Sequence, residues 1–215
     1  MQIPLQSISD YSGKLGRAGF VLFTTLVLSG CINLGLGNKE APAVTNYVLE
    51  DMGRAAVEHT SKPLALVVLD TQTTSFYDTD GIAYSDSDGT RSYYQYARWT
   101  ERPGKRMTDL LTLRLDKENL FKAVVGDGQV KADWLLDTEL LEFYHDASHP
   151  PGKARITLSA EVIDLTSHTL VGHKLFSVSE DLVRFDATGA HQGFDQATTR
   201  LLNDLVDWLA SLPGS

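Results

Sequence analysis

The chain has little cysteine and little positive charge, and each shortage excludes a class of protein. One cysteine among 215 residues excludes an internal disulfide. Nineteen Lys and Arg against 28 Asp and Glu give a net charge of −9 at pH 7. Nucleic acid and anionic lipid surfaces repel a chain this acidic, so we expect no nucleic-acid partner.

Catalytic signatures are also missing. The sequence has no Gly-x-Ser-x-Gly elbow, no Walker loop and no paired-glycine dinucleotide fingerprint. His145 and His149 are four residues apart, but prolines follow directly, and we interpret both as solvated loop histidines rather than metal ligands. The acidic stretch Asp86 to Gly89 does not fit the register of a calcium loop and predicts a turn. We therefore expect no catalytic residue, metal or cofactor.

Long apolar runs are scarce, and the run with a bearing on membrane attachment is residues 18–28. It is too short to span a bilayer comfortably, and no later stretch is long and apolar enough to do so. Two basic residues precede it and small residues follow it, which is the order of a secretory signal. The alternatives are an uncleaved N-terminal anchor and a lone buried cysteine that carries no lipid.

Leu28, Ser29, Gly30 and Cys31 close this run and resemble the bacterial lipobox. Small side chains at 29 and 30 give a peptidase access to the backbone, and the thiol is the soft nucleophile that accepts a diacylglyceryl group. We expect cleavage before Cys31, lipidation of this cysteine, and membrane attachment through its acyl chains. Ile32 stands where an Asp favours inner-membrane retention in enterobacterial lipoproteins, which indicates the outer membrane.

The signal divides the chain into three segments. Residues 1–30 form the signal peptide, residues 31–46 the lipidated cysteine and a flexible tether rich in Gly, Asn, Ala and Pro, and residues 47–215 one folded domain. Cleavage leaves 185 residues, enough for a sizeable core. The mature chain carries a net charge of −10, because the removed segment holds two bases and one acid.

Apolar and alternating patterns predict a sheet of six or seven strands. The expected strands are 47–49, 64–69, 82–84, 92–99, 121–125, 155–164 and 170–179, with a further amphipathic segment at 132–144. A polar turn at 85–89 predicts one hairpin, and a turn at 166–169 predicts that the last two strands are antiparallel.

Two segments predict helices. Pro103 opens the first, which runs through Leu120 and has an apolar stripe that Arg114 interrupts. The second ends the chain, with apolar residues at helical spacing: Phe194, Ala197, Leu201, Leu205, Trp208 and Leu212. Two helices are too few to alternate with the strands. We therefore predict an α+β fold, a single domain in which a mostly antiparallel sheet carries both helices on one face.

One basic cluster interrupts the acidic sequence. Arg98, Trp99, Arg102, Lys105 and Arg106 lie at the end of the predicted hairpin and the start of the first helix. They form a candidate contact for lipid phosphates or for an acidic partner surface. The alternative is that the charges solvate the helix entrance while the tryptophan packs in the core.

The order of several short motifs is similar to that of a known family. The motifs are the lipobox, Tyr47-Val48-Leu49, the strand Leu64 to Leu69, Ile82-Ala83-Tyr84, the segment Trp99 to Pro103, and Trp208-Leu209. From Tyr47 to Leu209 the chain resembles the ABC-type transport auxiliary lipoprotein family. The resemblance supplies no catalytic residue, and Cys31 alone carries over as a functional position.

The resemblance implies a role in an MCE-type transport system, which moves phospholipids between the inner and outer membranes. The implied partners are an MCE-family protein and its permease and ATPase, and the implied place is the periplasmic face of the envelope. Three alternatives stay open: regulation of a cell-wall synthase by direct contact, an anchored hydrolase with a polar cleft, and lipid binding in an apolar groove of the body. Exposed edge strands are natural sites for assembly into a homo-oligomer.

Overall fold

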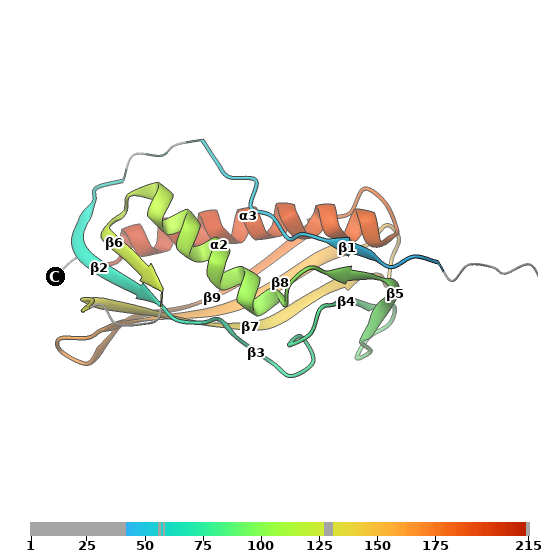
Figure 1. Cartoon of the computed structure of the whole chain (residues 1–215), viewed down its shortest axis with the longest axis horizontal. Coiled ribbons are helices and arrows are strands. Elements are labelled where there is room, and N and C mark those ends of the chain that lie inside the picture. Colours follow the sequence, from blue (N-terminus) through green and yellow to red (C-terminus); the bar gives the residue numbers. More distant parts are fainter. Residues whose placement is uncertain (1–41, 56, 58, 127–130, 214–215) are drawn as a thin grey trace, which may run out of the picture. The chain divides into compact units, whose positions relative to one another are not determined.

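The computed structural model describes residues 42–55, 57, 59–126 and 131–213 (Figure 1). The predicted signal peptide and its cleavage motif, Leu28, Ser29 and Gly30, lie outside the described residues. So do Cys31 and the predicted tether as far as residue 41.

Within the described residues, nine strands form one sheet. They are β1 (Thr45–Tyr47), β2 (Lys62–Val68), β3 (Gln72–Thr73), β4 (Gly81–Ser85), β5 (Ser92–Trp99), β6 (Phe121–Gly126), β7 (Trp134–Asp146), β8 (Lys153–Asp164) and β9 (Thr169–Asp181). The count exceeds the predicted six or seven for two reasons. β3 is too short to leave a pattern, and the amphipathic segment at 132–144 is almost entirely the strand β7.

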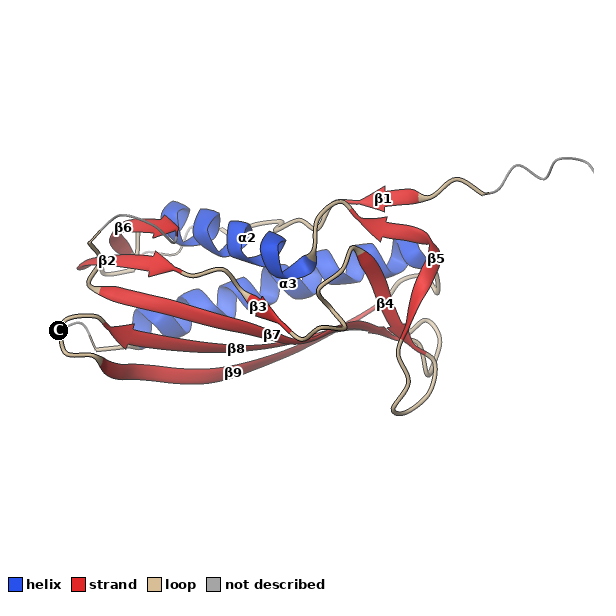
Figure 2. Ribbon diagram, turned by 60° about the horizontal axis from the view of Figure 1, so that its bottom comes forward, coloured by secondary structure: helices blue, strands red, loops and turns tan. Residues whose placement is uncertain are grey.

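Strand β7 organises the sheet (Figure 2). One edge pairs antiparallel with β8 over nearly its whole length. The other edge pairs in succession with β2, β3 and β4, all three parallel to it. Because a strand of 13 residues is longer than any of these three, they share its edge end to end. The sheet is therefore mixed, with its longest pairings antiparallel.

The predicted hairpins are confirmed. β4 and β5 are antiparallel across the polar turn, with Tyr84 opposite Ser92. β8 and β9 are antiparallel along their full length. The alternation predicted for β8 is also confirmed, because the apolar positions 156, 158, 160 and 162 are fully buried.

The two predicted helices are α2 (Pro103–Glu118) and α3 (Ala187–Ser211). Figures 1 and 2 show both on the same face of the sheet, which confirms the α+β class. α2 begins at a proline, whose missing N–H is harmless in the first turn, and Asn119 ends it in the left-handed conformation. α3 begins seven residues before Phe194, the first residue of its predicted stripe. Its N-cap is Asp186, whose carboxylate accepts from the Gly189 N–H at 2.8 Å.

The core lies between the helices and the sheet. α2 contributes Met107, Leu111 and Leu115, all fully buried, and α3 packs on β8 and β9. The rings of Phe143 and Phe194 stack with centroids 4.3 Å apart. Each fully buried side chain of this size contributes about 1.5–3 kcal/mol to the free energy of unfolding.

The folded body begins slightly before the predicted boundary. Thr45 pairs with Ala97 and Tyr47 with Trp99, so β1 extends the sheet parallel to β5. The last two residues of the predicted tether, Thr45 and Asn46, are therefore part of the sheet.

Candidate functional site

The predicted basic cluster lies where β5 leads into α2, and its charges already have partners. Arg98 donates to the carbonyl oxygens of Tyr94 and Ala97, at 2.6 and 2.9 Å. The Nε of Arg106 donates to the Leu49 carbonyl at 2.8 Å. These two side chains hold backbone segments together and offer little to a ligand.

Arg102 and Lys105 are the exposed members of the cluster. Arg102 donates to Asp78 at 3.1 Å, and Lys105 lies 3.4 Å from Glu101 and 2.9 Å from Asp109. The hydrogen bonds to Asp109 and Glu101 raise the pKa of Lys105 above its usual value. Both side chains are reachable, but the neighbouring acidic side chains neutralise much of their positive charge.

The interpretation of Trp99 as a contact residue is wrong. Its side chain is 3% exposed and packs against both Phe143 and Phe194, with ring centroids 5.7 and 5.5 Å away. Trp99 ends β5 on the face that the helices cover, so it belongs to the core, as the alternative interpretation holds.

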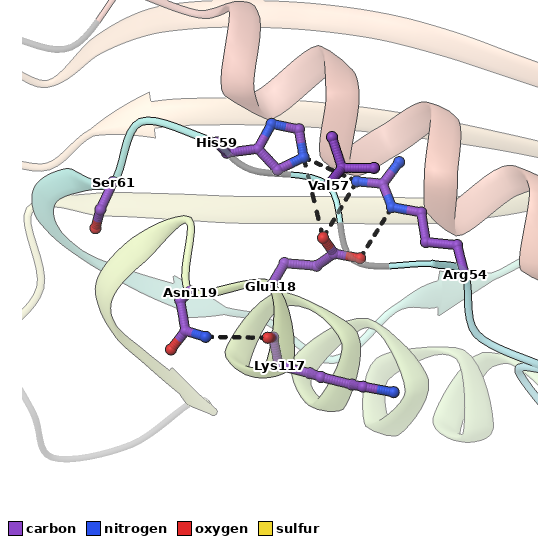
Figure 3. Close-up of a pocket in the computed structure, with 7 residues that line it drawn as sticks. All are labelled: Arg54, Val57, His59, Ser61, Lys117, Glu118 and Asn119. Atoms are coloured by element: carbon purple, nitrogen blue, oxygen red, sulfur yellow. Dashed lines mark hydrogen bonds and ion pairs between the residues drawn. The ribbon is translucent and has the colours of Figure 1, made fainter.

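A polar hollow of about 540 Å³ lies at the C-terminal end of α2, beside the connection between β1 and β2 (Figure 3). Arg54 is its central cation. Its Nε donates to Glu118 at 3.0 Å and its Nη1 to Asp207 of α3 at 2.8 Å. Burial lowers the pKa of Arg54, but the hydrogen bonds to Glu118 and Asp207 more than offset it and raise the pKa above the usual value. Arg54 is therefore a permanent cation that joins three segments.

His59 completes the polar wall of this hollow. Arg54 Nη2 lies 2.9 Å from His59 Nε2. Because a guanidinium can only donate, this ring nitrogen is the acceptor of that hydrogen bond. Figure 3 shows the hydroxyl of Ser61 directed away from His59. The described side chains of this hollow thus form no nucleophile and base pair.

The ionic network continues inward from Glu118 to Arg114. Arg114 is 3% exposed. It pairs with Asp51 through two nitrogens, donates to Asn203 of α3 at 2.5 Å, and lies 3.6 Å from Glu118. The residue that interrupts the apolar stripe of α2 is therefore a buried clamp between α2, α3 and the segment after β1. Such a network positions these three elements relative to one another.

The interpretation of His145 as a solvated loop residue is also wrong. His145 belongs to β7 and is completely buried. Its Nε2 lies 3.2 Å from the Pro151 carbonyl, which can only accept, so Nε2 carries the proton. Nδ1 then accepts from the Tyr94 hydroxyl at 2.7 Å. Burial lowers the pKa of His145 and raises that of Tyr94 to about 12, so the pair is neutral. His149 is exposed and contacts Ser148.

No group of three His, Cys, Asp or Glu side chains that could hold a metal ion occurs among the described residues. In the same part of the chain, no helix is long and apolar enough to cross a membrane. Between the sheet and the helices, large side chains such as Met107, Phe143 and Phe194 are fully buried against one another. These side chains occupy space between the two layers that a lipid-binding groove would need.

Comparisons with known proteins identify relatives of this fold. The sequence model of the family described as ABC-type transport auxiliary lipoprotein component matches residues 47–206. Among solved structures, protein XCC0632 from Xanthomonas campestris is similar with a TM-score of 0.69 and 21% identity, over 77% of this chain and 95% of that one. Hypothetical protein CT253 from Chlamydia trachomatis has a TM-score of 0.50 and 9% identity, over 70% and 96% of the two chains. No curated protein matches the sequence.

Proposed function

We propose that this chain, which belongs to the ABC-type transport auxiliary lipoprotein component family, is a lipid-anchored docking subunit of an envelope lipid transporter. The observation that carries the proposal is the family match over residues 47–206, which follows the sequence Leu28-Ser29-Gly30-Cys31 after a short connecting segment. A lipoprotein family belongs to the cell envelope, and its description as an auxiliary component names no reaction.

The anchor in this proposal is the lipid on Cys31. Residues 1–30 direct export and are removed, and the segment up to residue 44 connects the lipid to the folded body. With a net charge of −10 the mature chain gains little from anionic lipid, so its membrane attachment depends on apolar contact. The proposed location is the periplasmic face of the outer membrane.

The partner in this proposal is an MCE-family protein with its permease and ATPase, which move phospholipid between the two membranes. The body suits a docking role because its polar clusters hold elements together: Arg54 and Arg114 join α2, α3 and the segment after β1. Of the five cluster residues expected to meet a partner, Arg102 and Lys105 are the two that an acidic surface or a phosphate can reach.

A crosslinking pull-down from membranes, read by mass spectrometry, tests the proposal. We expect the natural chain to recover an MCE protein, a permease and an ATPase, and the Cys31→Ser chain to lose them. The double variant Arg102→Ala with Lys105→Ala should reduce recovery several-fold, because it removes the exposed cations and leaves the core intact. Lys122→Ala, which removes an exposed cation from β6, is the matched control and should behave like the natural chain.

Recovery of a cell-wall synthase without any transport component would contradict the proposal. It would favour the second candidate, an envelope lipoprotein that regulates a wall enzyme by contact. Equal recovery of the transporter by the natural and Cys31→Ser chains would show that docking does not need the anchor.

A further inference from the structure

Four large side chains stand exposed at one end of the body, and no polar cluster described above uses them. Val183 is 77% exposed, Phe185 53%, Tyr96 44% and Tyr93 37%. We call these four residues the aromatic end. Val183 and Phe185 lie on the connection between β9 and α3, and the two tyrosines lie on β5. A cluster of exposed apolar and aromatic groups on a folded body marks a contact surface.

One hollow is shared by β5 and the β9–α3 connection and links the two parts of the aromatic end. Phe185 and Tyr93 line the same hollow of about 540 Å³, together with Tyr84 and Tyr94. The Phe185 ring meets the buried His145 edge-on, with centroids 5.7 Å apart. Phe185 is thus supported on its inner side by packed protein while half of it faces outward.

The N-terminal segment leaves the body at this same end. Residues 47–52 run along α3 in the same direction as the helix. The hydroxyl of Tyr47 contacts Thr188, and the N–H of Met52 donates to Thr199 eleven residues later in the helix. Followed backwards, the chain passes the N-terminus of α3, which Val183 and Phe185 directly precede. Figure 1 shows β1, β5 and the start of α3 together at one end.

The proposed anchor keeps this end close to the bilayer. A fully extended chain from Cys31 to Val44 reaches at most about 45 Å. The lipid therefore holds the aromatic end at a high local concentration near the membrane surface, so that even a weak contact is well populated. Val44, next to β1, is itself half exposed.

We propose that the aromatic end is a second membrane contact, which rests in the interface of the bilayer that holds the lipid on Cys31. The inference rests on the anchor in the proposed function. Tyrosine suits this interface because it joins an apolar ring to a polar hydroxyl. The Tyr93 hydroxyl already donates to the Phe76 carbonyl oxygen, so its polar end is paired within the protein and the rest of the ring edge faces outward. Val183 and Phe185 enter slightly deeper.

The charges at the rim indicate an apolar contact. Arg184 pairs with Asp186, and Asp86 lines the hollow beside Tyr93. These groups give no net positive charge to attract anionic lipid. Binding should therefore change little with salt or with the fraction of anionic lipid, unlike the binding of a basic surface.

A single label on the mature chain tests the inference. Val183→Cys adds a thiol to a chain whose own cysteine is lipidated, and this thiol takes an environment-sensitive fluorophore. The matched control is Leu170→Cys, a residue 59% exposed at the opposite end of β9. Both labelled chains are reconstituted in phosphatidylethanolamine and phosphatidylglycerol vesicles, with a quencher on lipids near the headgroup.

We expect the label at 183 to shift to the blue and to be quenched at least several-fold more than the label at 170. Equal quenching at the two positions would overturn the inference, as would a label at 183 that is shielded by a second protein but not quenched by lipid. The N-terminal mass, measured on the same sample, reports separately on lipidation. A lipidated chain with an unquenched label refutes only the second contact, whereas an unlipidated Cys31 refutes the anchor of the proposed function.

Discussion

His145 shows how one buried side chain depends on its protonation state. Its ring is neutral in the folded chain, because Pro151 accepts its Nε2 proton and Tyr94 donates to Nδ1. A second proton would turn Nδ1 into a donor facing the Tyr94 hydroxyl, inside a site shielded from water. The lowered pKa of His145 follows mainly from this burial, which the hydrogen bond to Pro151 only partly opposes.

The lowered pKa predicts how stability depends on pH. In the unfolded chain His145 binds a proton below about pH 6.5, whereas in the folded chain it binds one only at lower pH. The free energy of unfolding therefore has its full His145 contribution above pH 6.5 and loses it as the pH falls below that value. Chemical denaturation at pH 7.5 and 5.5 should show a smaller pH effect for His145→Gln than for the natural chain.

Asp195 is a second buried group whose protonation affects the pH dependence of stability, equally in the natural and His145→Gln chains. Burial raises the pKa of Asp195, so its contribution to stability has the opposite sign and appears at lower pH. It is present in both chains and cancels between them. Equal pH dependence of the natural and His145→Gln chains would contradict the buried neutral histidine.

At the scale of elements, the sequence predicts patterns well and polar clamps poorly. The stripe of α2 and the alternation of β8 follow from periodicity alone, and the structure buries both. The role of Arg114, which interrupts the stripe of α2, could not be predicted. Its partners, Asp51 and Asn203, are 63 and 89 residues away in the sequence. Periodicity is a local signal and cannot show which distant carboxylate meets a charge.

The first seven residues of α3 were not predicted, for a different reason. Asp186, Gly189 and Gly193 carry no large apolar group, so the hydrophobic stripe begins only at Phe194. A Cβ on Gly189 would clash with the Arg184 carbonyl oxygen, and a Cβ on Gly193 would lie 2.8 Å from the Leu182 side chain. Close packing demands small residues here. The N-cap preference for Asp was the available sequence signal.

The Arg114 clamp gives a prediction at this scale. Arg114→Ala leaves the Asp51 carboxylate and the Asn203 amide without their main partner in a largely buried site. We expect a loss of about 3–5 kcal/mol in the free energy of unfolding, measured by chemical denaturation. Replacing both charges, with Arg114→Met and Asp51→Leu, should recover most of the loss because no unpaired charge is left behind. A double variant as unstable as Arg114→Ala would show that the pair itself is strongly stabilising.

For the whole molecule, composition and order predicted the class and the family, and contact geometry corrected the site. Two helices against many strands predicted α+β, and the dispersed motifs from Tyr47 onward predicted the family that matches residues 47–206. The prediction that the basic cluster is a contact site rests on charge alone. In the fold Trp99 is core, Arg98 and Arg106 hold backbone, and only Arg102 and Lys105 stay open to a partner.

The place of Val183 and Phe185 in the aromatic end could not be found from the sequence, for a related reason. Val183 and Phe185 look like ordinary strand or helix residues, and only the contacts of residues 47–52 along α3 bring them beside the departing N-terminal segment. In the arrangement that we propose, the aromatic end faces the membrane and the rest of the body is available for a protein partner.

The most direct test of this account is the mass of the N-terminal peptide of the chain extracted from membranes. We predict that residues 1–30 are absent and that Cys31 is the first residue, carrying a diacylglyceryl group. Globomycin-type inhibition of the signal peptidase should shift the mass to that of the uncleaved, lipidated chain. A membrane-bound chain that keeps residues 1–30 with an unmodified Cys31 would contradict the account, because the apolar segment 18–28 would then be the anchor.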